Sequence, residues 1–180
     1  DWGWERFVEL LKRITVAGGG EDRGAEARSF RVFVIGGPDE AENSARIVEA
    51  LAPGLPDAAT AGNHGLTVHD LTGRTTVRES AAVISECDLC IGNDTFGLHA
   101  AIMEHVPSIV ILGRQEGDRW GPWGDPAKHR AATLPEFHCE SENCGYTCPH
   151  APYKCIREIS VEQVLDEVRS VMSKVAAQAL

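Results

Sequence analysis

The stretch 87–112 constrains the fold of this chain more than any other part of the sequence. It reads CDLCIGNDTFGLHAAIMEHVPSIVIL. The apolar run 88–92 predicts a strand, and the polar residues 93–95 predict a sharp loop. A helix over 96–105 and a second strand over 108–112 complete the unit. Such a unit points the first amides of its helix into the crevice above the carboxyl ends of parallel strands, where open α/β sheets bind their ligands.

The start of this helix is the strongest candidate for a ligand site. The amides of a first helical turn lack partners within the helix and lie at the positive end of its dipole, so they suit a phosphate group. Residues 95–98 could donate such amides, Thr95 adds a hydroxyl, and His99 adds a further donor. The Asp94 carboxylate would repel phosphate and suits sugar hydroxyls instead. An ordinary Asn-Asp helix cap beside a half-buried histidine is the alternative explanation.

Two further loops are candidate binding segments. Gly37 and Asp39 lie in a turn between a strand and a helix, where a carboxylate could accept hydrogen bonds from a ribose, although the turn lacks the GxGxxG pattern. Alternatively, Asp39 only stabilises the helix dipole. Arg114 and Arg119 could neutralise phosphate, and a tryptophan of the segment 118–123 could cover a sugar or base. The alternative for that segment is a rigid surface loop held by its aromatic side chains.

The rest of the chain alternates between strands and helices. Strands are predicted at 30–35 and 66–71, and helices at 1–15, 39–51, 76–86 and from 161 onward. The closing helix begins at a capping box formed by Ser160 and Gln163. Its apolar face is predicted to consist of Val161, Val164, Leu165, Val168 and Met172. This alternation predicts an α/β fold, a Rossmann-like parallel sheet with helices on both faces, formed by a single domain over 1–180.

Charge and length exclude several classes of protein. The formal net charge of −10 argues against a nucleic-acid-binding surface, which requires a basic face. The sequence predicts no transmembrane segment, because every apolar run is far shorter than the ~18 residues of a membrane span. The chain begins at Asp1 rather than at Met, so it is consistent with a piece of a longer protein.

Four of the six cysteines gather in one loop-like segment, 137–158. They are Cys139, Cys144, Cys148 and Cys155, with His138 and His150 beside them. These side chains could hold a structural zinc, although their spacing differs from that of paired CxxC motifs. Reduced packing cysteines, redox pairs and, in an oxidising compartment, disulfides are the alternatives. Cys87 and Cys90 flank the strand predicted at 88–92 and are expected to pack as small hydrophobes.

Six short motifs occur in one order along nearly the whole chain. They are Trp2 with 5–10, then 34–40, 70–79, 88–99, 119–124 and 155–159. These residues resemble the motifs W-x-x-E-x-F-x-x-L, GGP-[ED]-E, DLTGKTSLRE, ADLVVGNDSGPMH, ARWGPYG and C-M-R-D-I of glycosyltransferase family 9, the ADP-heptose:lipopolysaccharide heptosyltransferases. The resemblance implies the C-terminal half of a GT-B glycosyltransferase, a donor-nucleotide-binding domain whose N-terminal acceptor domain lies outside this chain.

The resemblance also implies a role for each matching residue. Asp94 would contact the donor sugar, and His99 would lie beside the diphosphate. The diphosphate would accept hydrogen bonds from the amides of Thr95, Phe96, Gly97 and Leu98. Asp39, in the turn with Gly37, would reach the adenosine ribose. The turn formed by Arg74 and Thr75 would border the base.

The activity implied is inverting transfer of a sugar from a nucleotide donor, ADP-heptose, to a lipopolysaccharide core acceptor. The catalytic base would come from the N-terminal half, so this chain would bind nucleotide without transferring sugar and would contain no catalytic residue. The resemblance implies neither a cofactor nor a metal. It also implies a cytoplasmic location, with peripheral association of the full enzyme at the inner face of the inner membrane.

Two departures from the family pattern bear on the donor. Phe96 stands where the family has glycine, and the Gly-rich insertion 17–29 is unusual. One alternative is therefore another GT-B enzyme, such as a nucleotide-sugar epimerase or a transferase with a different donor. The other is a non-catalytic Rossmann-like module whose cysteine-rich loop binds a metal and a protein partner.

Overall fold

A computed structural model of the chain describes residues 1–17, 29–51, 66–113, 121–134, 148 and 153–178. The chain divides into two compact units. The first unit is Trp4–Thr76, and the second unit comprises Asp1–Gly3 and Val77–Leu180.

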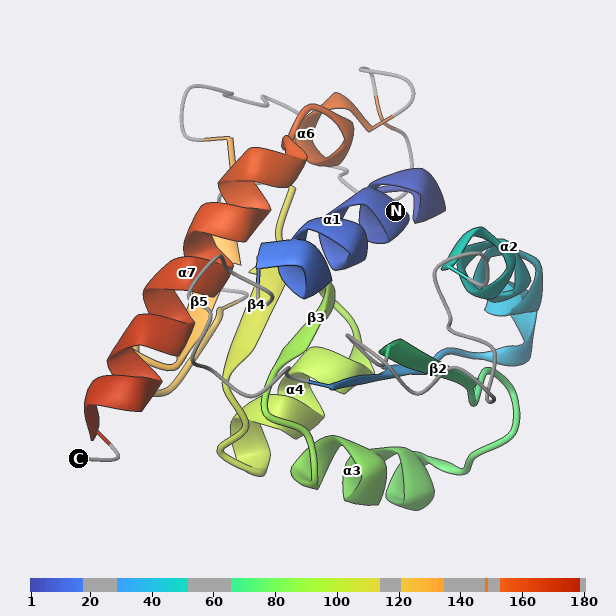
Figure 1. Ribbon diagram of the computed structural model, residues 1–180, viewed down its shortest axis with the longest axis horizontal. Helices are drawn as coiled ribbons and strands as arrows, with labels where there is room; N and C mark the ends of the chain where they lie inside the picture. Colours follow the sequence, from blue (N-terminus) through green and yellow to red (C-terminus); the bar gives the residue numbers. More distant parts are fainter. Residues whose placement is uncertain (18–28, 52–65, 114–120, 135–147, 149–152, 179–180) are drawn as a thin grey trace. The chain divides into compact units, whose positions relative to one another are not determined.

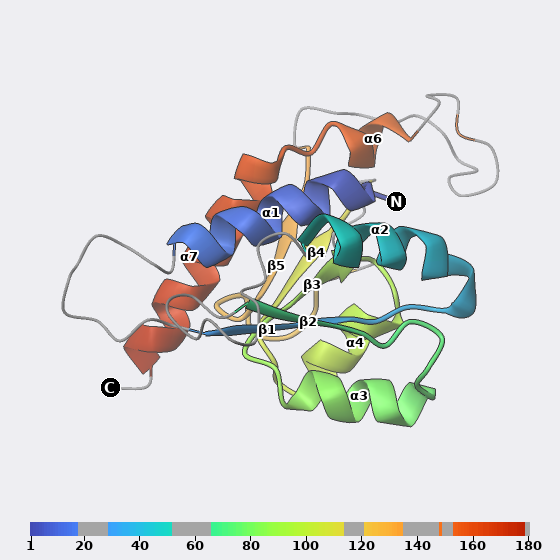
Figure 2. The same ribbon diagram turned by 45° about the vertical axis from the view of Figure 1, so that its right-hand side comes forward.

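The first unit is a pair of parallel strands covered by two helices. Its elements are α1 (Trp4–Ala17), β1 (Phe30–Val34), the short 3-10 helix η1 (Pro38–Glu40), α2 (Ala41–Leu51) and β2 (Leu66–Asp70). Strands β1 and β2 pair in parallel from Phe30 opposite Leu66 to Val34 opposite Asp70. Helices α1 and α2 lie together over this pair of strands (Figure 2). The core between them is formed by Val8, Ile47, Leu51 and Leu66.

The second unit is a three-stranded parallel sheet between helices. Its elements are α3 (Val77–Ser85), β3 (Cys90–Asn93), α4 (Phe96–Met103), β4 (Ser108–Ile111), β5 (His129–Ala132), α6 (Lys154–Arg157) and α7 (Val161–Gln178). The strand order is β3-β4-β5, and both pairings are parallel. Helix α4 packs on β3 and β4, whereas α7 packs on β4 and β5 from the opposite face (Figure 1). The central strand β4 is buried throughout, as expected for a parallel strand covered on both faces.

The predicted α/β fold with parallel strands and helices on both faces is confirmed. Four predicted strands and five predicted helices are present, with small shifts at their ends. Strand β5 and helix α6 were not predicted. The first helix begins at Trp4 rather than at Asp1, because Gly3 has a φ of 106°, which a right-handed helix cannot contain.

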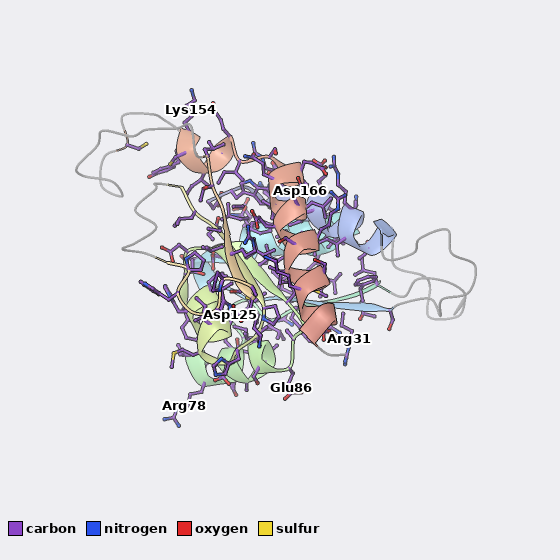
Figure 3. All side chains as sticks on the ribbon, turned by 90° about the vertical axis from the view of Figure 1, so that its left-hand side faces the viewer. Arg31, Arg78, Glu86, Asp125, Lys154 and Asp166 are labelled. Carbon is purple, nitrogen blue, oxygen red and sulfur yellow. The ribbon has the colours of Figure 1, made fainter. Side chains whose placement is uncertain are left out.

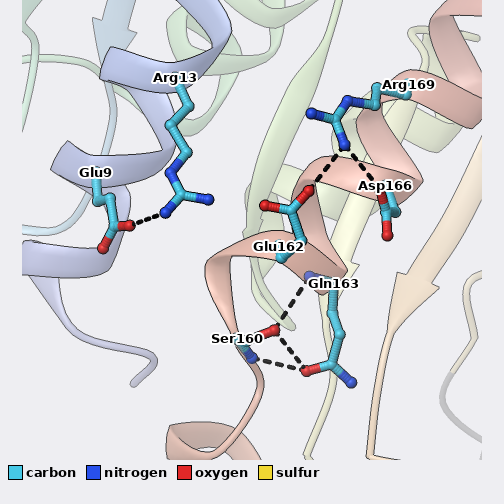
Figure 4. Close-up of polar contacts among 7 residues, drawn as sticks. All are labelled: Glu9, Arg13, Ser160, Glu162, Gln163, Asp166 and Arg169. Atoms are coloured by element: carbon cyan, nitrogen blue, oxygen red, sulfur yellow. Dashed lines mark hydrogen bonds and ion pairs between the residues drawn. The ribbon is translucent and has the colours of Figure 1, made fainter.

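The cap predicted for the closing helix is confirmed. The Ser160 Oγ accepts a hydrogen bond from the Gln163 amide at 3.2 Å, and the Ser160 amide donates to the Gln163 side chain at 2.8 Å (Figure 4).

The prediction that Met172 belongs to the apolar face is wrong, since Met172 is 38% exposed and Val171 is fully buried instead. Both residues fit helical spacing, and packing against the sheet selects Val171. Charged side chains such as Asp166 point away from the core (Figure 3).

A buried polar pair joins the amino ends of β4 and β5. The Ser108 Oγ lies 2.9 Å from the His129 Nδ1, and the two residues face each other across the strand pair. Both side chains are buried. Burial lowers the pKa of His129 below its ordinary value of 6.5; Asp125 opposes this shift, and Lys128 and His105 add to it. The histidine is therefore neutral in the folded chain near neutral pH.

Acidification is expected to destabilise the chain through His129. Below about pH 6.5 the unfolded chain binds a proton at this histidine that the folded chain does not bind, so the free energy of unfolding falls by up to about 1.4 kcal/mol per pH unit until the lower folded pKa is reached. Urea unfolding at several pH values between about 7.5 and about 5.5 measures this slope. His129→Gln should flatten it, with His69→Gln as the control for loss of an exposed histidine. The same slope in the wild type and His129→Gln would contradict this assignment.

Candidate functional site

The turn from β3 into α4 presents unpaired backbone amides. Thr95 precedes the helix in an extended conformation, with φ −142° and ψ 177°, and its side chain makes no cap hydrogen bond. Among the residues that the structure describes, no acceptor pairs with the amides of Phe96 and Gly97. The amide of Leu98 donates to the Thr95 carbonyl at 3.1 Å. The first two helical residues therefore offer free donors at the positive end of α4, which is suited to an anion.

Three side chains gather beside these amides. The His99 Nε2 lies 3.4 Å from the Asp94 Oδ1. The His99 ring also stacks on the Trp123 ring, with their centroids 5.7 Å apart and an interplanar angle of 29°. All three side chains remain partly accessible, and Trp123 is 49% exposed. The cluster therefore combines a carboxylate, an imidazole and an indole face next to free amides.

The apolar residues of the same segment fix α4 on the sheet. Leu98 is buried with Val110 and Leu112. Gly92 leaves room for it, since a Cβ at this glycine would lie 3.0 Å from Leu98 Cδ2. Leu98 was predicted to donate an amide to a ligand; its side chain belongs to the core and its amide is already paired within the turn. Within the described part of the chain, two of the three predicted donors that lie in the helix, the amides of Phe96 and Gly97, have no hydrogen-bond acceptor.

Cys90 lies under this turn and packs as predicted. Its thiol faces the carbonyl of Gly97, with 3.8 Å between the Sγ and the oxygen. Burial, together with a smaller contribution from Cys87, raises the pKa of Cys90 to about 12. The group therefore stays a neutral thiol, and thiolate chemistry is not expected from it near neutral pH.

Trp2 supports the site from the start of the chain, which sequence reasoning did not anticipate. Its backbone amide donates to the Asn93 Oδ1 at 3.2 Å, and its indole Nε1 donates to the Ile159 carbonyl at 2.7 Å. Trp2 is completely buried. Asn93 ends β3 and directly precedes Asp94, so these bonds hold the strand end from which the candidate site projects. The motif that begins with Trp2 singled out this residue in the sequence, but it did not predict where the side chain packs.

The residues predicted to hold the nucleoside occupy two adjacent turns of the first unit. The Gly73 amide donates to the Gly36 carbonyl at 2.9 Å. Gly73 has a φ of +67°, and a Cβ there would lie 3.3 Å from the Pro38 Cα, so both the backbone conformation and the space favour glycine. Gly37 and Asp39 lie in one turn, and Arg74 and Thr75 follow the other. Asp39 and Arg74 are exposed.

Two hydrogen bonds stabilise the second of these turns. The Asp70 Oδ1 accepts a hydrogen bond from the Thr72 amide at 2.9 Å, which closes a turn of the Asx type. The Thr72 hydroxyl donates to the Ser44 Oγ of α2 at 2.7 Å. The residues of the D-L-T-G motif therefore shape the turn, and the more exposed Arg74 follows it.

Several predicted residues lie outside the described part of the chain. These are Arg114, Arg119, Cys139, Cys144, His138 and His150. Within the described ranges, no group of three or more histidine, cysteine or acidic side chains could hold a metal ion. No described helix is long and apolar enough to cross a membrane. The described cysteines of the segment 137–158 are Cys148, which is half-buried, and Cys155, which is buried.

Comparison with known protein families matches residues 23–150 to Glycosyltransferase family 9 (heptosyltransferase). The chain belongs to this family. The resemblance to this family is thereby confirmed, and the match includes both turns that are predicted to hold the nucleoside and the whole β3–α4 unit of this family-9 chain.

Curated relatives of the family-9 chain are similar over part of their length. Lipooligosaccharide heptosyltransferase 2 of Campylobacter jejuni subsp. jejuni serotype O:6 is 25% identical over 107 residues, which are 59% of this chain and 33% of the relative. The protein of the same name from serotype O:2 is 26% identical over 108 residues, with the same coverage. The chain thus matches about a third of the length of these relatives.

Solved structures share the fold of the family-9 chain. The glycosyl transferase family 9 structure from Veillonella parvula DSM 2008 superposes with a TM-score of 0.66 at 21% identity, covering 96% of this chain and 42% of that one. The structure of E. coli ADP-heptose lps heptosyltransferase II gives a TM-score of 0.67 at 20% identity, covering 97% and 43%. The α/β fold described above is therefore part of the architecture of these transferases.

Proposed function

We propose that this family-9 chain binds the donor of a glycosyl transfer, a nucleoside-diphosphate sugar. The observation that carries the proposal is the start of α4, where the amides of Phe96 and Gly97 have no acceptor within the described part of the chain. A diphosphate would accept hydrogen bonds from these amides and from the Thr95 hydroxyl. The Asp94 carboxylate would accept hydrogen bonds from sugar hydroxyls. Preorganised amides of this kind also stabilise the negative charge that develops on a leaving diphosphate.

The identities of donor and acceptor are inferred from relatives. The names of the similar proteins specify heptose transfer to lipooligosaccharide or lipopolysaccharide, with ADP-heptose as a donor. We therefore assign ADP-heptose as the donor and a lipopolysaccharide core as the acceptor, in a reaction at the cytoplasmic face of the inner membrane. From the sequence motifs that carry them, we also propose Asp39, Gly37, Arg74, Thr75 and Arg114 as donor-binding residues. The base for inverting transfer is assigned to a part of the enzyme outside this chain.

The amide contribution can be isolated with a matched pair of variants at Phe96. Phe96→Ala removes the ring and keeps the amide, whereas Phe96→Pro removes both. Proline is well tolerated at the first helical position, and the extended Thr95 before it suits a following proline. Calorimetric titration with ADP should show about 10- to 100-fold weaker binding for Phe96→Pro than for Phe96→Ala, since a hydrogen bond to a charged group contributes about 1.5–3 kcal/mol. Equal affinities would rule out this turn as the diphosphate site.

Pyrophosphate, UDP and GDP separate the parts of the site. Asp39→Ala should weaken ADP binding and leave pyrophosphate binding unchanged, because pyrophosphate has no ribose. Phe96→Pro should weaken both. A preference of the wild type for UDP or GDP over ADP would retain a glycosyl donor and reject ADP-heptose. Absence of binding by all four ligands would reject the proposed function for this chain.

A further inference from the structure

Trp123 is the large side chain of the candidate site that the proposed function leaves without a role. It lies in the loop that enters β5, and 49% of its surface is exposed. In the site it stacks on His99, with 5.7 Å between the ring centroids. Because the Asp94 carboxylate lies 3.4 Å from the Nε2 of the same imidazole, His99 is held between a charge and an aromatic face.

The backbone around Trp123 is built to hold the indole in this place. A Cβ at Gly121 would lie 3.3 Å from the Trp123 Cε3, so the ring folds back over this glycine. On the other side, a Cβ at Gly124 would lie 3.0 Å from the His129 Cδ2 and 3.6 Å from the Ile102 Cγ2. The chain after Trp123 is therefore packed between β5 and α4.

The anchoring of this loop places Trp123 along the side of α4. Ile102 lies one turn after His99 in the helix, about 4.5 Å further along its axis. Gly124 packs beside Ile102, and the loop continues to His129, at the amino end of β5. Asp94 and Thr95 follow the opposite, carboxyl end of β3. The stack on the His99 ring therefore connects the indole to the candidate site.

We propose that Trp123 is a positioning residue, which orients the His99 imidazole toward the diphosphate of the donor. The inference rests on the proposed function. The Asp94 carboxylate accepts from the Nε2, and in the imidazolium form, in which both ring nitrogens carry a proton, the Nδ1 donates to a phosphate oxygen. The stack restricts rotation of the ring before the ligand arrives. Binding therefore does not have to immobilise a mobile side chain, and the affinity for the diphosphate rises.

A double-mutant cycle of Trp123 and His99 tests this role. Trp123→Ala should weaken ADP and pyrophosphate binding by about three- to tenfold, the range expected for loss of one aromatic stack. In a His99→Gln background the same change should alter affinity by less than about twofold, because the ring that Trp123 orients is absent. Trp123→Phe should restore most of the affinity, since phenylalanine can stack in the same way.

A readout without ligand keeps this inference separate from the proposed function. The stack should shift the imidazole C–H proton resonances of His99 upfield; Trp123→Ala should remove this shift, and Trp123→Phe should retain part of it. Equal losses from Trp123→Ala with and without His99 would overturn the inference, as would an unchanged His99 spectrum. Absence of nucleotide binding by the wild type would instead reject the proposed function, and this role of Trp123 with it.

Discussion

Replacement of Trp2 by alanine is expected to lower the free energy of unfolding by about 3–5 kcal/mol, the usual cost of deleting a large buried side chain. The side chain is completely buried, and its indole donates to the Ile159 carbonyl at 2.7 Å. The substitution therefore leaves both a cavity and an unpaired carbonyl. Since Asn93 accepts the Trp2 amide, loosening of this segment should also reach the start of the candidate site.

Conservative variants separate these contributions. Trp2→Phe fills most of the volume and removes the indole donor, so a loss of about 1–3 kcal/mol is expected from the unpaired carbonyl. Trp4→Phe is the matched control, because Trp4 is only partly buried and follows two residues later. Urea unfolding followed by circular dichroism measures the free energy of unfolding of Trp2→Ala, Trp2→Phe and Trp4→Phe. A Trp2→Ala variant as stable as Trp4→Phe would show that the buried indole contributes little.

The second large effect is expected at Gly113, just after β4. A Cβ at this position would lie 2.6 Å from the Ile156 Cγ1 and 2.9 Å from the Cys155 Sγ, which is closer than folded proteins tolerate. Gly113→Ala must therefore shift the side chains of Ile156 and Cys155, and overpacking of this kind costs about 1–3 kcal/mol. Cys155 and Ile156, which belong to the last of the six family motifs, thus pack directly against the residue that follows the central strand.

Two comparisons make the Gly113 prediction specific. Ile156→Ala creates space, so the cost of Gly113→Ala should fall by at least about 1 kcal/mol in that background, as neighbouring sites couple. Gly97→Ala is the control within α4, where a Cβ would meet only the Ile84 Cδ1 at 4.0 Å. That change should be neutral or stabilising, because alanine is the better helix former. Equal unfolding free energies for Gly113→Ala and the wild type would disprove the close packing.

Much of the candidate site could be predicted because its members are close in sequence. Asp94, Thr95 and His99 belong to one strand–turn–helix unit, whose periodicity and turn residues are read directly from the chain. The capping box at Ser160 was predictable for the same reason. Strand β5 was not, since the four residues His-Arg-Ala-Ala have neither alternation nor β-branched side chains and form a strand only through pairing with β4.

The amino-acid sequence alone predicts the family, through its resemblance to six motifs. Local patterns of apolar, turn and capping residues predict the α/β fold and the location of the amides at the start of α4. Three-dimensional packing was needed to show that Trp123 stacks on His99, that Trp2 is bound to Asn93 and Ile159, and that Val171 rather than Met172 is buried. Those contacts join residues far apart in the chain or choose between neighbours that fit one helical period equally well. Packing of whole elements, which local propensity does not encode, makes that choice.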